Sequence, residues 1–195
     1  MLKTAECVSP GHPDKVCDRI SDAVLDAYLT QDPKSRVAVE TVGSHGKVLV
    51  TGEVTTTATD VDVVKIVEDI AGDGLDISVH IVAQSPEIAQ GVDTGGAGDQ
   101  GIMTGYATRE TDSYMPKEYE LARGLCQAVY EIYPYDGKTQ VTLGEDGKVF
   151  SVVCSFQNAP TEELVTLVKE IIPEAGEYHI NPAGDWSQGG VDADA

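Results

Sequence analysis

The hydrophobic and polar positions of the chain follow two periods, one helical and one alternating. Helical spacing predicts helices over residues 13–29, 60–71, 115–133 and 160–172. Alternation predicts strands over 36–42, 47–56, 76–84, 138–143, 148–156 and 177–181, with a further strand over 1–8. The order helix, strand, strand, helix, strand therefore occurs twice, with corresponding elements about 100 residues apart.

This repetition indicates an α+β fold made of two repeated α-β-β-α-β modules. Each module would form a small antiparallel or mixed sheet with its helices on one face. We assign the first module to residues 9–111 and the second to residues 112–195. The strand over residues 1–8 is expected to pair with the second module.

A Gly-rich segment over residues 84–101 interrupts the periodic pattern inside the first module. Loops of this length in compact domains are usually lids or binding loops, so we expect it to gate a site. A flexible linker is the alternative. The polar side chains that could contact a ligand from this segment are Gln84, Asp93, Asp99 and Gln100.

The first predicted hairpin carries two acidic residues. If residues 43–46 form a four-residue turn, Arg36 lies opposite Glu53, and Glu40 and Glu53 share one face of the sheet. That register predicts a face that carries carboxylates. The alternative is an Arg36–Glu53 ion pair on a solvated sheet.

Residues 9–15 (SPGHPDK) place an imidazole, a carboxylate and an ammonium group where the first helix begins. Pro13 suits the first turn of a helix, where its missing N–H costs little. Unpaired backbone N–H groups at such a helix start favour a phosphate near His12, and Asp14 could hold the magnesium ion that accompanies it. The alternative is an ordinary helix cap at Asp14.

The composition bounds the class of protein. The 195 residues are 41% hydrophobic and 24% charged, which is typical of globular proteins. No apolar run could span a bilayer and no apolar leader is visible, so we expect a cytoplasmic protein that does not contact membranes. Its four cysteines are widely spaced and indicate neither a zinc site nor a disulfide framework. They are expected to be small buried side chains.

The charge balance is strongly acidic. With 13 Lys and Arg against 33 Asp and Glu, the formal net charge is −20. This argues against nucleic acid as a partner, because phosphate backbones are bound through clustered cations. If the chain binds a polyphosphate, divalent metals or cations from another polypeptide must offset the repulsion. A merely solvated acidic surface, suited to a salty medium, is the alternative.

Several short segments match, in order, the sequence pattern of one enzyme family. They are residues 6–15 (ECVSPGHPDK), 20–27 (ISDAVLDA), 50–56 (VTGEVTT), 84–86 (QSP), 90–93 (QGVD), 96–101 (GAGDQG), 180–182 (INP) and 189–190 (GG). With these motifs the chain resembles methionine adenosyltransferase, also called S-adenosylmethionine synthetase, over essentially its whole length.

The resemblance implies that the methionine sulfur attacks C5′ of ATP and that the whole triphosphate leaves. The triphosphate is then cleaved to phosphate and diphosphate. Such a reaction depends on neutralising the departing triphosphate more than on a general base, because the thioether nucleophile is uncharged. ATP and L-methionine are the implied substrates, and Mg²⁺ and K⁺ the implied cofactors.

The resemblance also implies a role for each matching residue. His12 and Lys138 would be catalytic. The ATP-binding residues would be His12, Asp136, Lys138, Asp185, Trp186 and Asp194, and the methionine-binding residues Glu53, Gln84, Asp99 and Asp194. Asp14 would bind magnesium and Glu40 would bind potassium.

The chain departs from the family pattern in three places. The segment between Asp93 and Gly96 is shorter than usual, and Asp185 stands where the family commonly has an arginine beside the aromatic residue. The family also continues past the position of Ala195 into a third module, which carries an Arg-Lys pair, two phosphate-binding lysines and a second magnesium-binding aspartate.

Three hypotheses follow for the function. The leading one is a subunit of a split synthetase, whose basic third module comes from a second polypeptide in a hetero-oligomer. The second is a compact homo-oligomeric enzyme that uses Lys15, Lys47 and Lys138 as its cations. The third is a non-catalytic subunit that binds nucleotide or regulates a full-length relative.

Overall fold

In the computed structural model, which describes residues 1–193, the chain divides into two compact units. The first unit comprises Val16–Gly105. The second unit comprises Met1–Lys15 together with residues 106–193. None of the helices among the described residues has both the length and the apolar content needed to cross a membrane.

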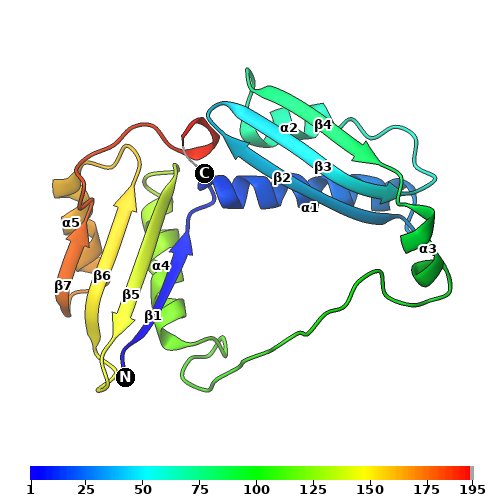
Figure 1. Cartoon of the computed structure of the whole chain (residues 1–195). Coiled ribbons are helices and arrows are strands. Elements are labelled where there is room, and N and C mark those ends of the chain that lie inside the picture. The colour runs from blue at the N-terminus through cyan, green and yellow to red at the C-terminus, as the bar shows by residue number, and fades with distance from the viewer. Residues whose placement is uncertain (194–195) are drawn as a thin grey trace. The chain divides into compact units, whose positions relative to one another are not determined.

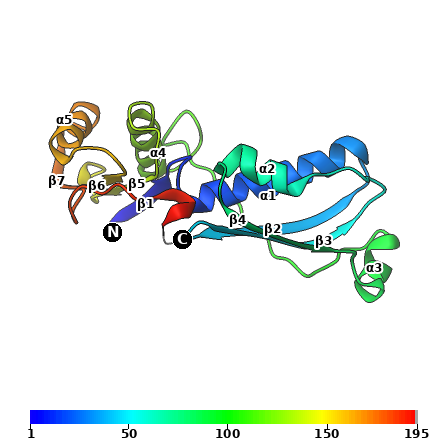
Figure 2. The same cartoon turned by 90° about the horizontal axis from the view of Figure 1, so that it is seen from above.

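The first unit is a three-stranded sheet covered on one face by helices. Its elements are α1 (Pro13–Gln31), β2 (Arg36–Ser44), β3 (Lys47–Thr55), α2 (Val63–Ala71), β4 (Asp76–Val82) and α3 (Pro86–Asp93). In the strand order β2-β3-β4, the first pair is antiparallel and the second is parallel. Helices α1 and α2 lie on the same face of this sheet (Figure 2). Ile20, Val24, Val50 and Val67 form part of the core and are fully buried.

The second unit repeats this arrangement and adds one strand (Figure 1). Its elements are β1 (Lys3–Val8), α4 (Lys117–Tyr130), β5 (Gly137–Leu143), β6 (Val149–Phe156), α5 (Thr161–Ile171), β7 (Ala175–Ile180) and the 3₁₀ turn η1 (Gly190–Asp192). The strand order is β1-β5-β6-β7, antiparallel except for the parallel pair β6 and β7. Helices α4 and α5 pack on one face, over a core that includes Leu125, Phe156 and Leu164.

The expected fold class is therefore confirmed: each unit contains the order α-β-β-α-β around a mixed sheet. The parallel pair in each sheet follows from the crossover helix, because parallel strands require a long connection such as α2 or α5. Strand β1 pairs along its whole length with β5, from Lys3 opposite Leu143 to Val8 opposite Lys138.

The register predicted for the first hairpin was wrong. Ser44 pairs with Lys47, so the turn contains only two residues, His45 and Gly46, with φ angles of 51° and 71°. Two successive positive φ angles are typical of the tight turns that match the strand twist. Arg36 consequently lies opposite Thr55, and Glu53 lies opposite Ala38. Because the slip is two residues, the side chains predicted to share a face still do so.

One buried polar side chain holds the end of the second sheet together. Asn181 is 3% exposed, and its Oδ1 accepts the Phe156 N–H at 3.1 Å while its Nδ2 donates to the Ala159 carbonyl at 2.9 Å. Its φ angle of 40° lies in the left-handed region that asparagine tolerates better than most residues. Asn181 therefore satisfies two backbone groups that would otherwise be buried without partners.

We expect Asn181→Ala to destabilise the second unit by about 2–4 kcal/mol, because both backbone groups lose their partners. Asn158→Ala is the matched control, since Asn158 also has a positive φ, of 58°, but an exposed side chain. Urea unfolding followed by the fluorescence of the single tryptophan, Trp186, reports on this unit. Equal losses in the two variants would contradict the role given to Asn181.

Candidate functional site

The turn before α1 is anchored on the second unit by backbone and hydroxyl contacts. Ser9 donates its N–H to the Gly137 carbonyl and its hydroxyl to the Tyr135 carbonyl, each at 2.8 Å. A Cβ added at Gly11 would lie 2.6 Å from the carbonyl carbon of Tyr135, so only glycine fits there. These contacts place the start of α1 firmly against the residues that open β5.

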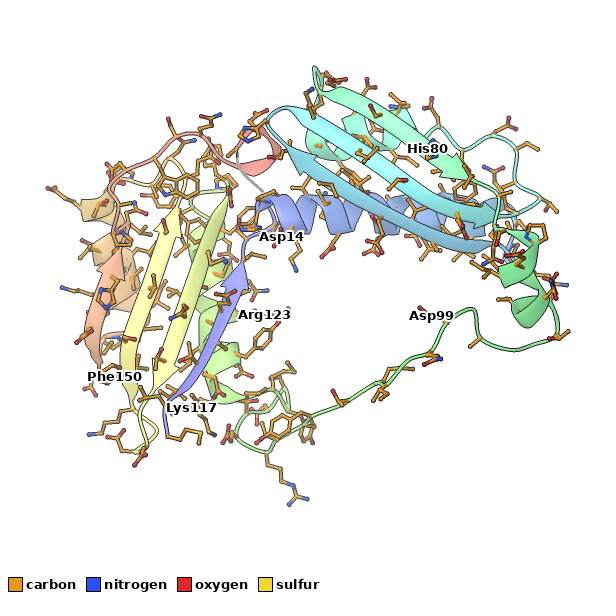
Figure 3. The ribbon with its side chains drawn as sticks, viewed as in Figure 1. Asp14, His80, Asp99, Lys117, Arg123 and Phe150 are labelled. Atoms are coloured by element: carbon orange, nitrogen blue, oxygen red, sulfur yellow. The ribbon has the colours of Figure 1, made fainter. Side chains whose placement is uncertain are left out.

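His12 and Asp14 lie together in this turn. The Nδ1 atom of His12 accepts the Asp14 backbone N–H at 3.2 Å and lies 3.8 Å from Asp14 Oδ2. A neutral imidazole that accepts at Nδ1 carries its proton on Nε2, so Nε2–H is the atom with which His12 can donate. The Asp14 side chain is 71% exposed, and Figure 3 shows it at the first turn of α1.

Asp136 has a structural role in the same region. It is 9% exposed, and its carboxylate accepts the Gly190 N–H at 2.9 Å. Gln157 accepts the Asp136 N–H at 3.3 Å and donates to the Ser187 carbonyl at 2.8 Å. Asp136 and Gln157 thus hold the C-terminal segment of the second unit beside the start of β5.

Lys138 and Trp186 belong to the open face of the second sheet, opposite α4 and α5. Lys138 pairs in register with Ser155, whose hydroxyl accepts the indole N–H of Trp186 at 3.1 Å. The Lys138 ammonium lies 3.5 Å from a carboxylate oxygen of Glu6 and is 47% exposed. A cation and an aromatic ring are therefore available on one polar face, where they could contact an anion and a base.

Asp185 caps helix α5. Its carboxylate accepts both the backbone N–H, at 3.0 Å, and the hydroxyl of Thr161, the first residue of α5. The N-cap residue of this helix is Pro160, which makes no side-chain cap hydrogen bond, so Asp185 supplies the missing acceptor. The hydrogen bonds from the Thr161 hydroxyl and then the Thr161 N–H lower the pKa of Asp185 below its ordinary value.

In the first unit, Glu40 and Glu53 lie on the sheet face away from α1 and α2, and Glu53 pairs with Val82 on β4. Glu40 also lines a cleft of about 370 Å³ with Asp18 and Asp22 of α1. The Oε1 atom of Gln84 is buried and has no hydrogen-bond partner in the described structure. A buried acceptor without a partner is available to a hydrogen-bond donor on a ligand.

Helix α3 is an element that the sequence pattern missed within residues 84–101. Ser85 caps it by accepting the Ile88 N–H at 3.4 Å, and Pro86 occupies its first position. This Ser-Pro start was the signal that could have revealed it. Asp99 lies beyond α3 on an extended exposed segment (Figure 3).

Arg36 holds α3 on the first unit. Its guanidinium lies 2.9 Å from a carboxylate oxygen of Asp93, the last residue of the helix. A carboxylate there is unfavourable against the negative end of the helix dipole, and α3 has no basic residue in its last turn. Because none of the residues of α3 is buried, this ion pair is a principal tether of the helix. The Arg36–Glu53 pair considered from the sequence is replaced by this contact.

The candidate residues thus fall into two sets. His12, Asp14, Asp136, Lys138, Asp185 and Trp186 belong to the second unit, whereas Glu40, Glu53, Gln84 and Asp99 belong to the first. Asp194 lies outside the described residues. Sequence reasoning did not identify Ser9, Gln157 or Arg36 as positioning residues, because their contacts join segments far apart in the chain.

The described residues contain no group of three or more His, Cys, Asp or Glu side chains arranged to hold a metal ion. Asp14 nevertheless fits the way in which Mg²⁺ accompanies a polyphosphate, with one or two carboxylates from the protein and the remaining ligands from phosphate oxygens and water. Glu40 offers one carboxylate, a hard oxygen ligand of the kind that suits a hard cation.

Comparison with known proteins gives a consistent family match. Residues 1–86 match the family profile described as S-adenosylmethionine synthetase, N-terminal domain, and residues 94–186 match its central domain. The chain is 41% identical to the S-adenosylmethionine synthase of Clostridium tetani, in an alignment covering 100% of this chain and 63% of that protein. It is 43% identical to the synthase of Nocardia farcinica, over 89% of this chain and 52% of that protein. The chain therefore spans only part of the length of these relatives.

We expect Arg36→Gln to loosen α3 without unfolding the first unit. Amide hydrogen exchange across residues 86–93 should become about two- to fivefold faster, as the loss of a partly exposed ion pair predicts. Lys47→Gln removes a different exposed ion pair in the same unit, with Asp76, and should leave this exchange unchanged. Unaltered exchange in Arg36→Gln would show that the tether lies elsewhere.

The stabilisation by Asp185 should depend on pH. Because the folded state lowers the pKa of this carboxyl below 3.8, its contribution is present above that value and is lost as the pH falls through the folded pKa. Asp185→Ala should therefore unfold at a lower temperature than the wild type near neutral pH, and the difference should shrink in acid. Asp185→Asn keeps an acceptor oxygen and should retain part of the stability without the pH dependence. Calorimetry measures all three proteins, and a difference that does not change with pH would refute the assignment.

Proposed function

Because the chain belongs to the S-adenosylmethionine synthetase family and carries its N-terminal and central domains, we propose that it is a subunit of a split S-adenosylmethionine synthetase. It would form S-adenosylmethionine, phosphate and diphosphate from ATP and L-methionine, in the cytoplasm. The observation that carries the proposal is the match over both domains. The turn before α1, which brings His12 and Asp14 together, supports it because these groups suit a triphosphate with its magnesium ion.

The proposed roles in the second unit concern ATP. His12 donates from Nε2 to the triphosphate near the breaking C5′–O bond, and Lys138 neutralises negative charge as the triphosphate leaves. Trp186 stacks against the adenine. Its indole N–H is bonded to Ser155, which leaves the ring on the same sheet face as Lys138. Asp136 and Asp185 support ATP binding through the backbone that they hold, since their carboxylates are already engaged by Gly190 and Thr161. Asp194 is proposed to contact both substrates.

The proposed roles in the first unit concern methionine and potassium. Gln84 and Glu53 bind methionine, and the buried unpartnered Oε1 of Gln84 is the atom that would accept a hydrogen bond from it. Asp99 contributes a carboxylate from the extended segment that follows α3. Glu40 binds the potassium ion, and Asp14 of the second unit binds magnesium. Bound Mg²⁺ would neutralise charge on the triphosphate when ATP is present.

The charge of the chain supports the proposal of a basic partner. The net charge of −20 opposes the approach of a triphosphate, and a single lysine at position 138 cannot reverse it. In the relatives, the additional length beyond this chain amounts to more than a third of each protein. We propose that a second polypeptide supplies the missing module and its phosphate-binding cations, which gives a hetero-oligomer.

Reconstitution tests the proposal. The chain is incubated with ATP, L-methionine, Mg²⁺ and K⁺, alone and together with the product of the neighbouring reading frame, and S-adenosylmethionine and diphosphate are quantified by chromatography. The mixture should form both products and the chain alone neither. His12→Ala in the mixture should lower the rate by about 10²–10³-fold, the usual effect of removing one preorganised donor.

Other outcomes separate the alternative functions. Full activity of the chain alone would replace the split enzyme by the compact homo-oligomer, in which Lys15, Lys47 and Lys138 are the available cations. Binding of ATP without turnover in every combination would indicate the regulatory subunit. Co-purification followed by mass spectrometry identifies the partner and shows whether it is basic.

A further inference from the structure

Two cysteines, Cys7 and Cys126, line one pocket where strand β1 packs on helix α4. Cys7 on β1 is half-buried and packs against the core of the second unit, to which Cys126 of α4 belongs with 2% exposure. Thr139 lies opposite Cys7 in the β1–β5 register and donates its hydroxyl to the Ala122 carbonyl of α4 at 2.7 Å. Ala122 lies one helical turn before Cys126. The hydrogen bond therefore aligns the Cys7 end of β1 with the part of α4 that carries Cys126.

The two thiols line a pocket that has an opening to solvent. The pocket has a volume of about 500 Å³, and besides the two cysteines its charged and aromatic lining residues are Lys15, Arg123, Glu131, Tyr119 and Tyr130. Figure 3 shows Arg123 on the helix α4 that also carries Cys126. The two cations outnumber the single carboxylate, and with the two aromatic rings they suit a small organic molecule that carries carboxylates. None of these residues is among the proposed ATP-binding and methionine-binding residues.

The environments of the cysteines give them different reactivities. Burial, with a further contribution from a hydrogen bond and the charge of Cys7, raises the pKa of Cys126 to about 12. Only a thiolate attacks a disulfide, so the half-buried Cys7 is the better first nucleophile. Burial also raises the pKa of Cys154 to about 12, but Cys154 does not line the pocket. Cys17 belongs to the first unit.

We propose that Cys7 and Cys126 form a thiol–disulfide exchange site for a small disulfide that carries carboxylate groups, of which glutathione disulfide is the test compound. The Cys7 thiolate attacks one sulfur of the small disulfide, forms a mixed disulfide and releases one thiol. The Cys126 sulfur then attacks the Cys7 sulfur of the mixed disulfide, forms the Cys7–Cys126 bond and releases the second thiol. The two protein thiols are oxidised by two electrons, and the small disulfide is reduced to two thiols.

The second step should be the slower one, because Cys126 is a thiolate only rarely. Once formed, the bond would link β1 to α4, close a loop that contains the whole first unit, and so constrain the unfolded chain. Since Ser9 and His12 follow β1 directly, oxidation would also restrain the turn that they form.

The test incubates the whole chain with glutathione disulfide and follows its intact mass and its peptides over time. The wild type should first gain the mass of one glutathionyl group and then lose it, ending with a cross-linked peptide that contains Cys7 and Cys126. Cys126→Ala should stop at the stable adduct on Cys7, whereas Cys154→Ala should behave as the wild type. If Cys126→Ala does not fold, the cross-linked peptide of the wild type decides the question.

A persistent adduct on Cys7 in the folded wild type, or an unreacted Cys7, would overturn the proposal. Recognition of the carboxylates is tested with Arg123→Gln. This variant should react about threefold or more slowly with glutathione disulfide, because it loses electrostatic attraction. It should react normally with hydroxyethyl disulfide, which is uncharged. Equal slowing with both compounds would overturn the anionic specificity.

Discussion

The antiparallel pairing of β1 with β5 is the interaction on which the second unit depends. It joins residues more than a hundred positions apart, and it brings the turn around Ser9 against the residues that open β5. Ser9 can donate to Tyr135 and Gly137 only because Val8 is fixed opposite Lys138. The position of His12, the fit of Gly11 and the meeting of Cys7 with α4 all follow from this one register.

Much of the polar chemistry near this pairing serves structure first. The carboxylate of Asp136 accepts a hydrogen bond from the Gly190 backbone N–H, and that of Asp185 accepts one from the Thr161 backbone N–H. Asp185 therefore has a structural role, because it supplies the acceptor that the start of α5 otherwise lacks. Lys138 differs from both, because its ammonium is half-exposed and meets only a partly exposed Glu6 at 3.5 Å. A ligand on this face could therefore bind the Lys138 ammonium without breaking a buried ion pair.

The fold could be predicted from the sequence because its elements carry strong periodic signals. In β3, Val48, Val50 and Val54 are buried, whereas Lys47 and Leu49 are exposed. This alternation, with the helical spacing of Ile20 and Val24 in α1, indicated the type of these elements. The hairpin register could not be predicted in the same way, because a two-residue and a four-residue turn preserve the same alternation. The positive φ of His45 decided it, and histidine is not a strong turn signal.

The candidate site was only partly accessible from the sequence for a related reason. His12, Asp14 and Lys138 stand in recognisable local motifs, whereas the contacts that position them come from distant segments. The Arg36–Asp93 ion pair joins residues 57 positions apart (93 − 36), and the pairing of Asp136 with Gly190 spans 54. Nothing in the local pattern around Arg36 distinguishes a partner on α3 from one on β3.

The division of the chain has a consequence for its synthesis. The first unit lies wholly between β1 and the rest of the second unit, so it is an insertion within that unit. On a ribosome, β1 emerges about 130 residues before β5, a delay on the order of ten seconds. During that time the first unit can fold, whereas β1 has no partner strand until β5 has been synthesised. Lys3 and Glu6, with opposite charges on this short segment, are the kind of residue that keeps such a strand from pairing with other chains.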